Sequence, residues 1–273
     1  MEETIRRMEI DAEAVLRYMA TNGLVANASK TSFLLLGAHN PEHKNANLKI
    51  GSDVLQRETS AKLLGVRFQD DLLWKEQIYG KGGVLSALNS RHYIIRRLMS
   101  HVSLKSSLKL VDGLFTSKIR YGLQLTGRAR MTNEDPECAA FKAIQTIQNN
   151  LMRTLNGTKT RDKISIKSLL KKFGMLSVNQ INASIKLLEI WKALNDNQHP
   201  LKIKRQAANE EGALTRAAQR SRPMEMGGTT RLRSTAIADA ITIWNKAPPA
   251  IQESKTIYQA KKAIKTYVNS LPI

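Results

Sequence analysis

The sequence is poor in cysteine, in long apolar runs and in any leader-like start. Its single cysteine, Cys138, excludes an internal disulfide framework and a cysteine-rich zinc site. No apolar run approaches the roughly 18 residues that a membrane-spanning helix requires. The first residues, MEETIRRMEID, are charged and acidic, which is unlike a secretory signal. We therefore expect an intracellular protein, nuclear or cytoplasmic, that has no membrane partner.

Acidic residues are also scarce, and most of the deficit lies beyond residue 58. The chain has 43 Lys and Arg against 23 Asp and Glu, a net charge of +20. Residues 1–58 hold 7 basic and 8 acidic residues, so 59–273 holds 36 basic and 15 acidic, a net of +21. Such a local surplus favours a polyanionic partner, most often nucleic acid, over a merely soluble basic protein. Because aromatic residues make up only 5%, we expect phosphate contacts and little base stacking.

A nucleotide-binding loop is absent as well, although Lys30 and Thr31 sit in a suggestive stretch, NGLVANASKTSFLLLG. The loop needs G-x-x-x-x-G-K-[ST] between a strand and a helix, because its backbone N–H groups cradle phosphates. Here Gly23 lies seven residues before Lys30, and Ser29 stands where the second glycine should be. An apolar, strand-like run follows, which excludes this class of site.

The sequence does contain an α+β pattern that is mostly helical. Apolar residues from Ile5 to Met19 recur at helical spacing, and Asn22-Gly23 predicts the end of that helix. Residues 52–58 are interpreted as a connector. Strands are predicted at Ser32–Leu36, Leu48–Ile50 and Lys62–Phe68, and further helices at 75–99, 104–126, 137–155, 164–173, 178–197, 235–246 and 256–269.

These elements divide the chain into four parts. We predict a helix with a small antiparallel sheet over 1–73, a helical region over 74–200, a basic flexible linker over 201–233 and a helical segment over 234–273. Two or three short strands leave an apolar face to cover, so the first part looks like a piece of a larger domain.

Motifs in the first part resemble the reverse transcriptases of non-LTR retrotransposons, the long interspersed elements. Those proteins show W-x-x-x-N-x-L-x-x-N-x-x-K-T after a helix, then L-G-V, a hydrophobic residue and L-x-W. The chain matches the first line at Asn22, Leu24, Asn27, Lys30 and Thr31, with Tyr18 at the tryptophan position, and the second at Leu64-Gly65-Val66, Phe68, Leu72 or Leu73, and Trp74.

The rest of the chain continues the resemblance in the same order. The family shows Y-G at a helix end, then Q-x-x-x-N-x-x-x-R, then W-N-x-x-P. Matching residues here are Tyr121-Gly122, then Gln145, Asn149 and Arg153, then Trp244-Asn245 and Pro248. The resemblance departs at Thr126, where the family commonly has tryptophan, and at Ala247, where it has leucine in W-N-x-L-P.

The resemblance implies an α+β fold in which a remnant of the polymerase palm is followed by a helical thumb and a helical C-terminal extension. Lys30 would be the lysine proposed to protonate the departing pyrophosphate. Leu64, Gly65 and Val66 would be primer-grip-like, a tight hairpin pressing on the primer terminus. The alternatives from the residues alone are a solvated turn at Lys30 and an ordinary strand with a glycine at 64–66.

The family's catalytic [FY]-x-D-D segment, which with one earlier aspartate holds two Mg²⁺ ions, would lie upstream of the first helix. We interpret Asp70-Asp71 as a helix cap before Trp74 and not as a substitute. We therefore expect no cofactor in this chain, Mg²⁺ only in a full-length RNA-directed DNA polymerase, and no catalytic residue here.

The expected role is to grip RNA and DNA, as a template–primer duplex, through the basic helices. The alternatives are a non-enzymatic RNA- or DNA-binding protein of retroelement origin and a helical scaffold. Stretches 91–128 and 153–172 each carry seven or more cations against one acid. Candidate phosphate contacts are Arg91, Arg96, Arg97, Lys105, Lys109, Arg120, Lys171 and Lys172.

Overall fold

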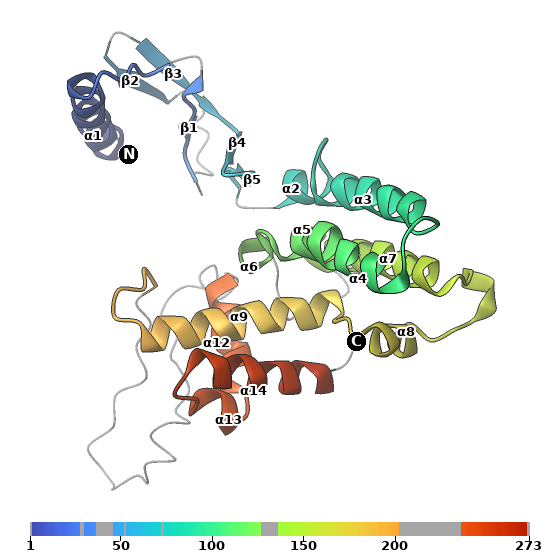
Figure 1. Cartoon of the computed structure of the whole chain (residues 1–273). Helices are drawn as coiled ribbons and strands as arrows, with labels where there is room; N and C mark the ends of the chain where they lie inside the picture. The colour runs from blue at the N-terminus through green and yellow to red at the C-terminus, as the bar shows by residue number, and fades with distance from the viewer. Residues whose placement is uncertain are drawn as a thin grey trace, which may run out of the picture. The chain divides into compact units, whose positions relative to one another are not determined.

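The computed structural model describes residues 2–27, 30–36, 46–51, 53–71, 74–126, 136–201 and 236–271. These residues form two compact units, Met1–Gly83 and Val84–Ile273. The described strands all lie in the first unit, which we call the sheet unit, and the second, the helical unit, is built of helices (Figure 1). The predicted α+β class with mostly helix is confirmed. Apart from Leu201, the predicted linker lies outside the described residues.

The first helix, α1 (Glu2–Thr21), ends where the sequence predicts. Gly23 adopts a left-handed conformation with φ of 70°. Its N–H donates to the Ala20 carbonyl at 3.0 Å, and the Leu24 N–H donates to the Met19 carbonyl at 2.8 Å. This pair of bonds is the Schellman motif, in which a glycine without a Cβ closes a helix by satisfying its last carbonyls.

The sheet unit contains a three-stranded sheet in the order β1-β3-β2. The outer strand β2 (Asn47–Ile50) runs antiparallel to β3 (Asp53–Glu58), whereas β1 (Phe33–Leu34) runs parallel to it. Antiparallel pairing is therefore confirmed for β2 and β3, and the parallel β1–β3 pair is an addition. Phe33, Ala46 and Leu48 form a small core on which Ile5 and Met8 of α1 pack.

The interpretation of residues 52–58 as a connector is wrong, because β3 is the central strand. Its burial alternates, with Leu55 and Arg57 half-buried and their neighbours exposed. The alternation is that of a strand with one solvated face, but the inward positions include an arginine, which hid the apolar pattern.

A second pairing is the hairpin of β4 (Ser60–Leu63) and β5 (Val66–Gln69). The single strand predicted over 62–68 is wrong, because Leu64 and Gly65 form a two-residue turn with φ of 48° and 81°. Positive φ at both turn residues is the type I′ geometry, which matches the right-handed twist of the flanking strands.

The single helix predicted over 75–99 is interrupted. α2 (Lys75–Tyr79) ends before a glycine-containing break, and α3 (Val84–Leu98) follows it. A Cβ at Gly80 would lie 2.4 Å from the Glu76 carbonyl oxygen, and one at Gly83 would lie 2.8 Å from that of Gly80. Only glycine permits this close approach of backbone to backbone.

The helix predicted over 104–126 is also subdivided. A π-helical segment, η3 (Val111–Thr116), joins α4 (Leu104–Leu110) to α5 (Ser117–Arg120). Gly122, with φ of 79°, then separates α5 from α6 (Leu123–Thr126).

The remaining predicted helices are confirmed within a few residues. They are α7 (Pro136–Asn156), α8 (Ile166–Phe173), α9 (Val178–Asn195), α12 (Ala236–Asn245) and α14 (Ile257–Ser270), with short turns η4 (Thr160–Asp162) and α13 (Pro249–Gln252) added.

The most extensive contacts between helices of the helical unit fall into two sets. α3 packs along α7, and α9 lies beside α12 and α14 (Figure 1). The side chains buried between α9, α12 and α14 include Leu187, Trp191, Trp244 and Val268. Within the described ranges, no helix combines the length and apolar character needed to cross a membrane.

Candidate nucleic-acid interface

The Gln145–Asn149 pair of the family-like series has a structural role in α7. The Gln145 side-chain N–H donates to Asn149 Oδ1 at 2.7 Å, and Gln145 Oε1 accepts from the Val178 N–H at 2.9 Å. That N–H belongs to the first turn of α9, where backbone donors have no partner within the helix. Gln145 therefore fastens the start of α9 to α7.

The tryptophan of the W-N-x-x-P box is also used in packing. Trp244 is 2% exposed, and its carbonyl accepts a hydrogen bond from the Gln252 amide at 2.9 Å. The residues that match the family motifs in sequence therefore contribute here to contacts between helices and to helix ends.

The Lys30 segment forms a turn immediately before β1. The Lys30 N–H donates to the Asn27 carbonyl at 3.1 Å, and the Thr31 hydroxyl donates to the same carbonyl at 2.9 Å. The Lys30 side chain is exposed.

The hairpin tip lies in the same unit and presents an apolar side chain to solvent. Leu64 is 83% exposed, whereas Val66 beside it is buried. Leu64 and Gly65 thus form a tight turn and Val66 begins β5. A primer-contacting role for the three residues stays a prediction.

The helix-cap interpretation of Asp70 is wrong. The N-cap of α2 is Trp74, which makes no side-chain cap bond, and Gln69 Oε1 accepts from the Glu76 N–H at 2.8 Å. Asp70 instead accepts a hydrogen bond from the Arg57 guanidinium at 2.6 Å, with the arginine side chain 5% exposed. Residues Phe68 to Asp71 match the pattern [FY]-x-D-D. They lie at the end of β5 and directly after it, away from the hairpin turn.

The candidate phosphate contacts are exposed, with one exception. Arg91 is half-buried, and its guanidinium donates to the Leu114 carbonyl, which ties α3 to η3. The exposed ones lie in the last turn of α3, in α4, in α5 and in the last turn of α8: Arg96, Arg97, Lys105, Lys109, Arg120, Lys171 and Lys172.

Three of these cations have local partners. The Arg97 guanidinium lies 5.8 Å from the centre of the Tyr93 ring. Lys172 Nζ donates to Asn156 Oδ1 at 2.6 Å, and Arg120 pairs with Asp112 at 3.5 Å. An exposed ion pair such as Arg120–Asp112 is worth little, about 0–1 kcal/mol, so an incoming phosphate can displace it.

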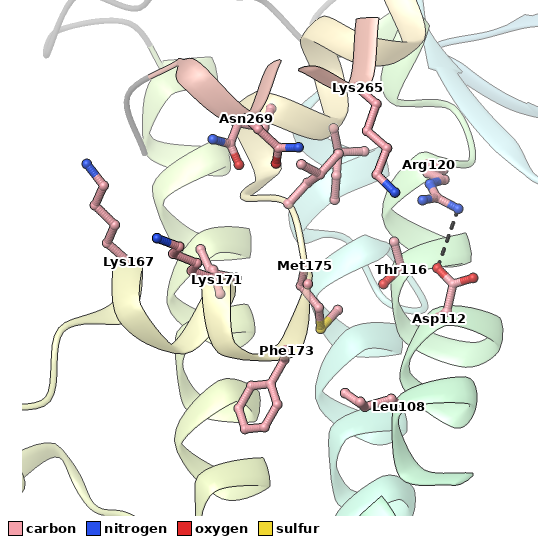
Figure 2. Close-up of a pocket in the computed structure, with 15 residues that line it drawn as sticks. Leu108, Asp112, Thr116, Arg120, Lys167, Lys171, Phe173, Met175, Lys265 and Asn269 are labelled. Atoms are coloured by element: carbon pink, nitrogen blue, oxygen red, sulfur yellow. Dashed lines mark ion pairs between the residues drawn. The ribbon is translucent and has the colours of Figure 1, made fainter. Parts of the chain in front are cut away.

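A groove in the helical unit gathers cations from three separate stretches of chain. It has a volume of about 870 Å³ and lies between α4–α5, α8 and α14. Two predicted residues, Arg120 and Lys171, line it together with Lys167 and Lys265 (Figure 2). Asp112 is its one acidic lining residue. The groove therefore combines four cations with one acid.

Lys265 escaped the sequence analysis, although a signal was present. The helix α14 contains three lysines and no acidic residue, but it lies nearly a hundred residues from α8. Nothing in the sequence alone indicates that α14 packs along α9, and that packing brings Lys265 to the groove.

The floor of the groove is apolar. We use the word floor for the apolar side chains that line the groove, of which Leu108, Met175 and Leu176 are half-buried and Leu170, Phe173 and Ile181 are buried. Phe173 is 8% exposed, so its ring offers little surface for stacking.

One wall residue of the groove, Thr116, is polar and buried. It is 4% exposed, and its hydroxyl has no hydrogen-bond partner among the described residues. The arrangement can hold an anion that also carries an apolar part.

The chain matches no family model, no curated protein and no solved structure in comparisons with each. The described residues also bring no three His, Cys, Asp or Glu side chains together in a way that would hold a metal ion.

Proposed function

We propose that this chain is the C-terminal part of a reverse transcriptase of the non-LTR retrotransposon type, and that it grips a template–primer duplex of RNA and DNA. The sheet unit corresponds to a remnant of the palm, and the helical unit to the thumb and C-terminal extension. Mg²⁺ would belong to the full-length polymerase.

The observation that carries the proposal is the set of exposed cations on the helical unit. Seven of the eight candidates are exposed, and none of those seven has a buried ion-pair partner among the described residues. Helices that present several cations each are suited to following a phosphate backbone, since each contact releases condensed counterions. The ordered motifs of both units and the tight hairpin at Leu64-Gly65 in the sheet unit add support.

The test is the salt dependence of binding to an RNA–DNA primer duplex. On duplex DNA, the logarithm of affinity falls with the logarithm of salt by about 0.9 for each phosphate contact. Replacing Arg96 and Arg97 by Ala should therefore flatten the slope by up to about two and leave sequence preference, which we expect to be slight, unchanged.

The matched control removes two exposed charges from the near-neutral sheet unit. Arg6→Ala with Lys49→Ala changes the net charge by the same amount, and the slope should stay almost the same. Equal losses from the two double variants would mean that the chain is a diffuse polycation without a defined duplex-binding surface.

A second experiment addresses catalysis. With Mg²⁺, primer and template, the chain alone should not extend the primer, because no trio of carboxylates is assembled in the described residues to bind two metal ions. If extension occurred and were lost on replacing Asp70 and Asp71 by Asn, that pair would be part of a metal site.

A further inference from the structure

We propose that the groove between α4–α5, α8 and α14 is a binding site for a phosphorylated anion of nucleotide size. The ligand's phosphates would lie against the cations, and its base and sugar on the apolar floor. This site shares Arg120 and Lys171 with the cations proposed to contact a duplex, but it takes a different ligand and does not rest on the reverse transcriptase assignment.

The size of the groove suits a small ligand. Sites for small molecules and cofactors commonly have volumes of about 300–1,000 Å³, are mostly apolar and have a few convergent polar groups. The groove, at about 870 Å³, falls in that range. A duplex, by contrast, is gripped along two backbones over a broad surface, which a pocket of this size does not offer.

The charge of the lining selects a multiply charged anion. Four cations face one acid, and that acid, Asp112, is already paired with Arg120 at 3.5 Å. In Figure 2 the Lys265 side chain extends from α14 on the side where Arg120 lies, whereas Lys167 extends outward from α8. Lys171 and Lys265, from two different helices, are therefore the cations to test.

The buried hydroxyl of Thr116 marks one position in the groove where a ligand atom could accept or donate a hydrogen bond. In an α-helix a threonine hydroxyl commonly donates to the carbonyl four residues earlier. Here that carbonyl, of Asp112, accepts the Ser117 N–H across the wide π-helical turn, and the hydroxyl has no partner among the described residues. A buried polar group without a partner costs free energy, and a phosphate oxygen in the groove would remove that cost.

The apolar floor separates a nucleotide from simple phosphate. Leu108, Met175 and Leu176 are half-buried and offer surface to a base and sugar, and burying apolar area there adds affinity that inorganic phosphate cannot gain. The shared chemistry is thus a phosphate chain joined to a nucleoside. Its source is either a free nucleotide or the 5′-phosphorylated end of a strand.

Isothermal titration of the full chain with ATP, inorganic triphosphate and adenosine tests the composite site. ATP should bind at least tenfold more tightly than either part, since only ATP uses both the cations and the floor. Two results would overturn the proposal. One is equal affinity for ATP and triphosphate, and the other is no ATP binding at about 1 mM, the weak end of the range usual for small-molecule sites.

Two variants with a matched control locate the binding. Lys171→Gln with Lys265→Gln should weaken ATP binding at least tenfold. Lys105→Gln with Lys109→Gln removes the same charge from exposed positions of α4 outside the groove lining, and should change it less than about twofold. Equal losses from both double variants would show a diffuse charge effect and overturn the site.

Thr116→Val distinguishes a ligand-binding role of the hydroxyl from a purely structural one. It should weaken ATP binding about tenfold, because hydrogen bonds to charged groups are the stronger ones. It should leave the thermal midpoint of the ligand-free chain unchanged or raised, since the hydroxyl it removes has no partner there. Unchanged ATP affinity in this variant would remove Thr116 from the site.

A short oligonucleotide distinguishes the two sources. If the site takes a strand end, a 5′-phosphorylated pentanucleotide should bind more tightly than ATP and lose at least tenfold when its 5′-phosphate is removed. If the site takes free nucleotides, ATP should bind more tightly than either oligonucleotide. If the chain binds duplex but not ATP, this site is overturned and the duplex-binding proposal stands. If the chain binds ATP but Arg96→Ala with Arg97→Ala leaves the salt slope of duplex binding unchanged, the duplex-binding proposal is overturned and this site stands.

Discussion

Lys186 of α9 and Asp239 of α12 form an ion pair inside the helical unit. Their side chains are 2% and 9% exposed. Removing one partner from such a pair leaves a buried charge without compensation, and it costs about 3–5 kcal/mol. We predict a loss of that order for Asp239→Asn in the free energy of unfolding measured with urea.

The control lies on the same helix. Lys192 pairs with Glu189 at 3.4 Å in a half-exposed position, so Lys192→Gln should cost no more than about 1 kcal/mol. Replacing Lys186 and Asp239 together by Met and Leu should recover much of the loss, because well-packed apolar residues often substitute for a buried pair. Full additivity of the single losses would argue against a coupled pair.

His92 of α3 makes stability depend on pH. Its Nε2 lies 3.0 Å from the Thr154 hydroxyl, and burial, with the nearby Arg96 charge, lowers its pKa from the usual 6.5. The unfolded chain then binds a proton more readily than the folded chain, so stability is complete above pH 6.5 and falls as pH drops through the lowered folded pKa.

The measurement compares unfolding by urea at pH 7.5 and pH 5.5 for the natural chain and for His92→Gln. The glutamine variant should lose less stability over this interval, because it does not take up that proton. The same pH dependence in both chains would assign the effect to other groups.

The β4–β5 hairpin carries strain at its tip. Leu64 has φ of 48°, in the left-handed region that costs a residue with a Cβ roughly 1 kcal/mol, and Asn is tolerated there. Leu64→Asn should therefore raise the stability of the sheet unit by about 0.5–1 kcal/mol. The measurement is the midpoint of thermal unfolding.

Val25 supplies the comparison for that change. It is 92% exposed and lies outside the hairpin, so Val25→Asn removes a similar exposed apolar side chain without relieving a strained turn. It should alter stability by less than about 0.5 kcal/mol. A larger gain from Val25→Asn than from Leu64→Asn would assign the effect to apolar exposure.

Long helices were predictable from sequence, and their interruptions were not. Apolar spacing gave α7, α9 and α14 within a few residues, because their cores repeat at helical intervals. The break at Gly80 depends on a close backbone approach, the break at Gly122 on a left-handed backbone, and the strand β3 on an inward arginine, and apolar spacing records none of these. The groove could be anticipated only as a set of cations, since its walls come from helices far apart in the chain.

The two units should unfold separately. Each has its own core, with Phe33, Ala46 and Leu48 in the sheet unit and a larger set around Trp244 in the helical unit. A small core buries little apolar surface, so the sheet unit should be the less stable. We predict two thermal transitions, the lower one raised by Leu64→Asn and the upper one lowered by Asp239→Asn.

Calorimetry with the two variants distinguishes this outcome from a cooperative chain. A single transition that both substitutions shift would mean that the units unfold together and that their cores are energetically one.

The π-helical turn at Val111–Thr116 has a consequence for chain length. In a uniform α-helix, twelve residues advance three turns and about 120° more, so Leu108 and Arg120 would point to different sides. A wide turn absorbs about one extra residue and reduces that angle to about 20°, which lets Leu108, Asp112, Thr116 and Arg120 all line the groove. A chain one residue shorter at Gly113 would keep all its charges and still lose the groove's α4–α5 wall.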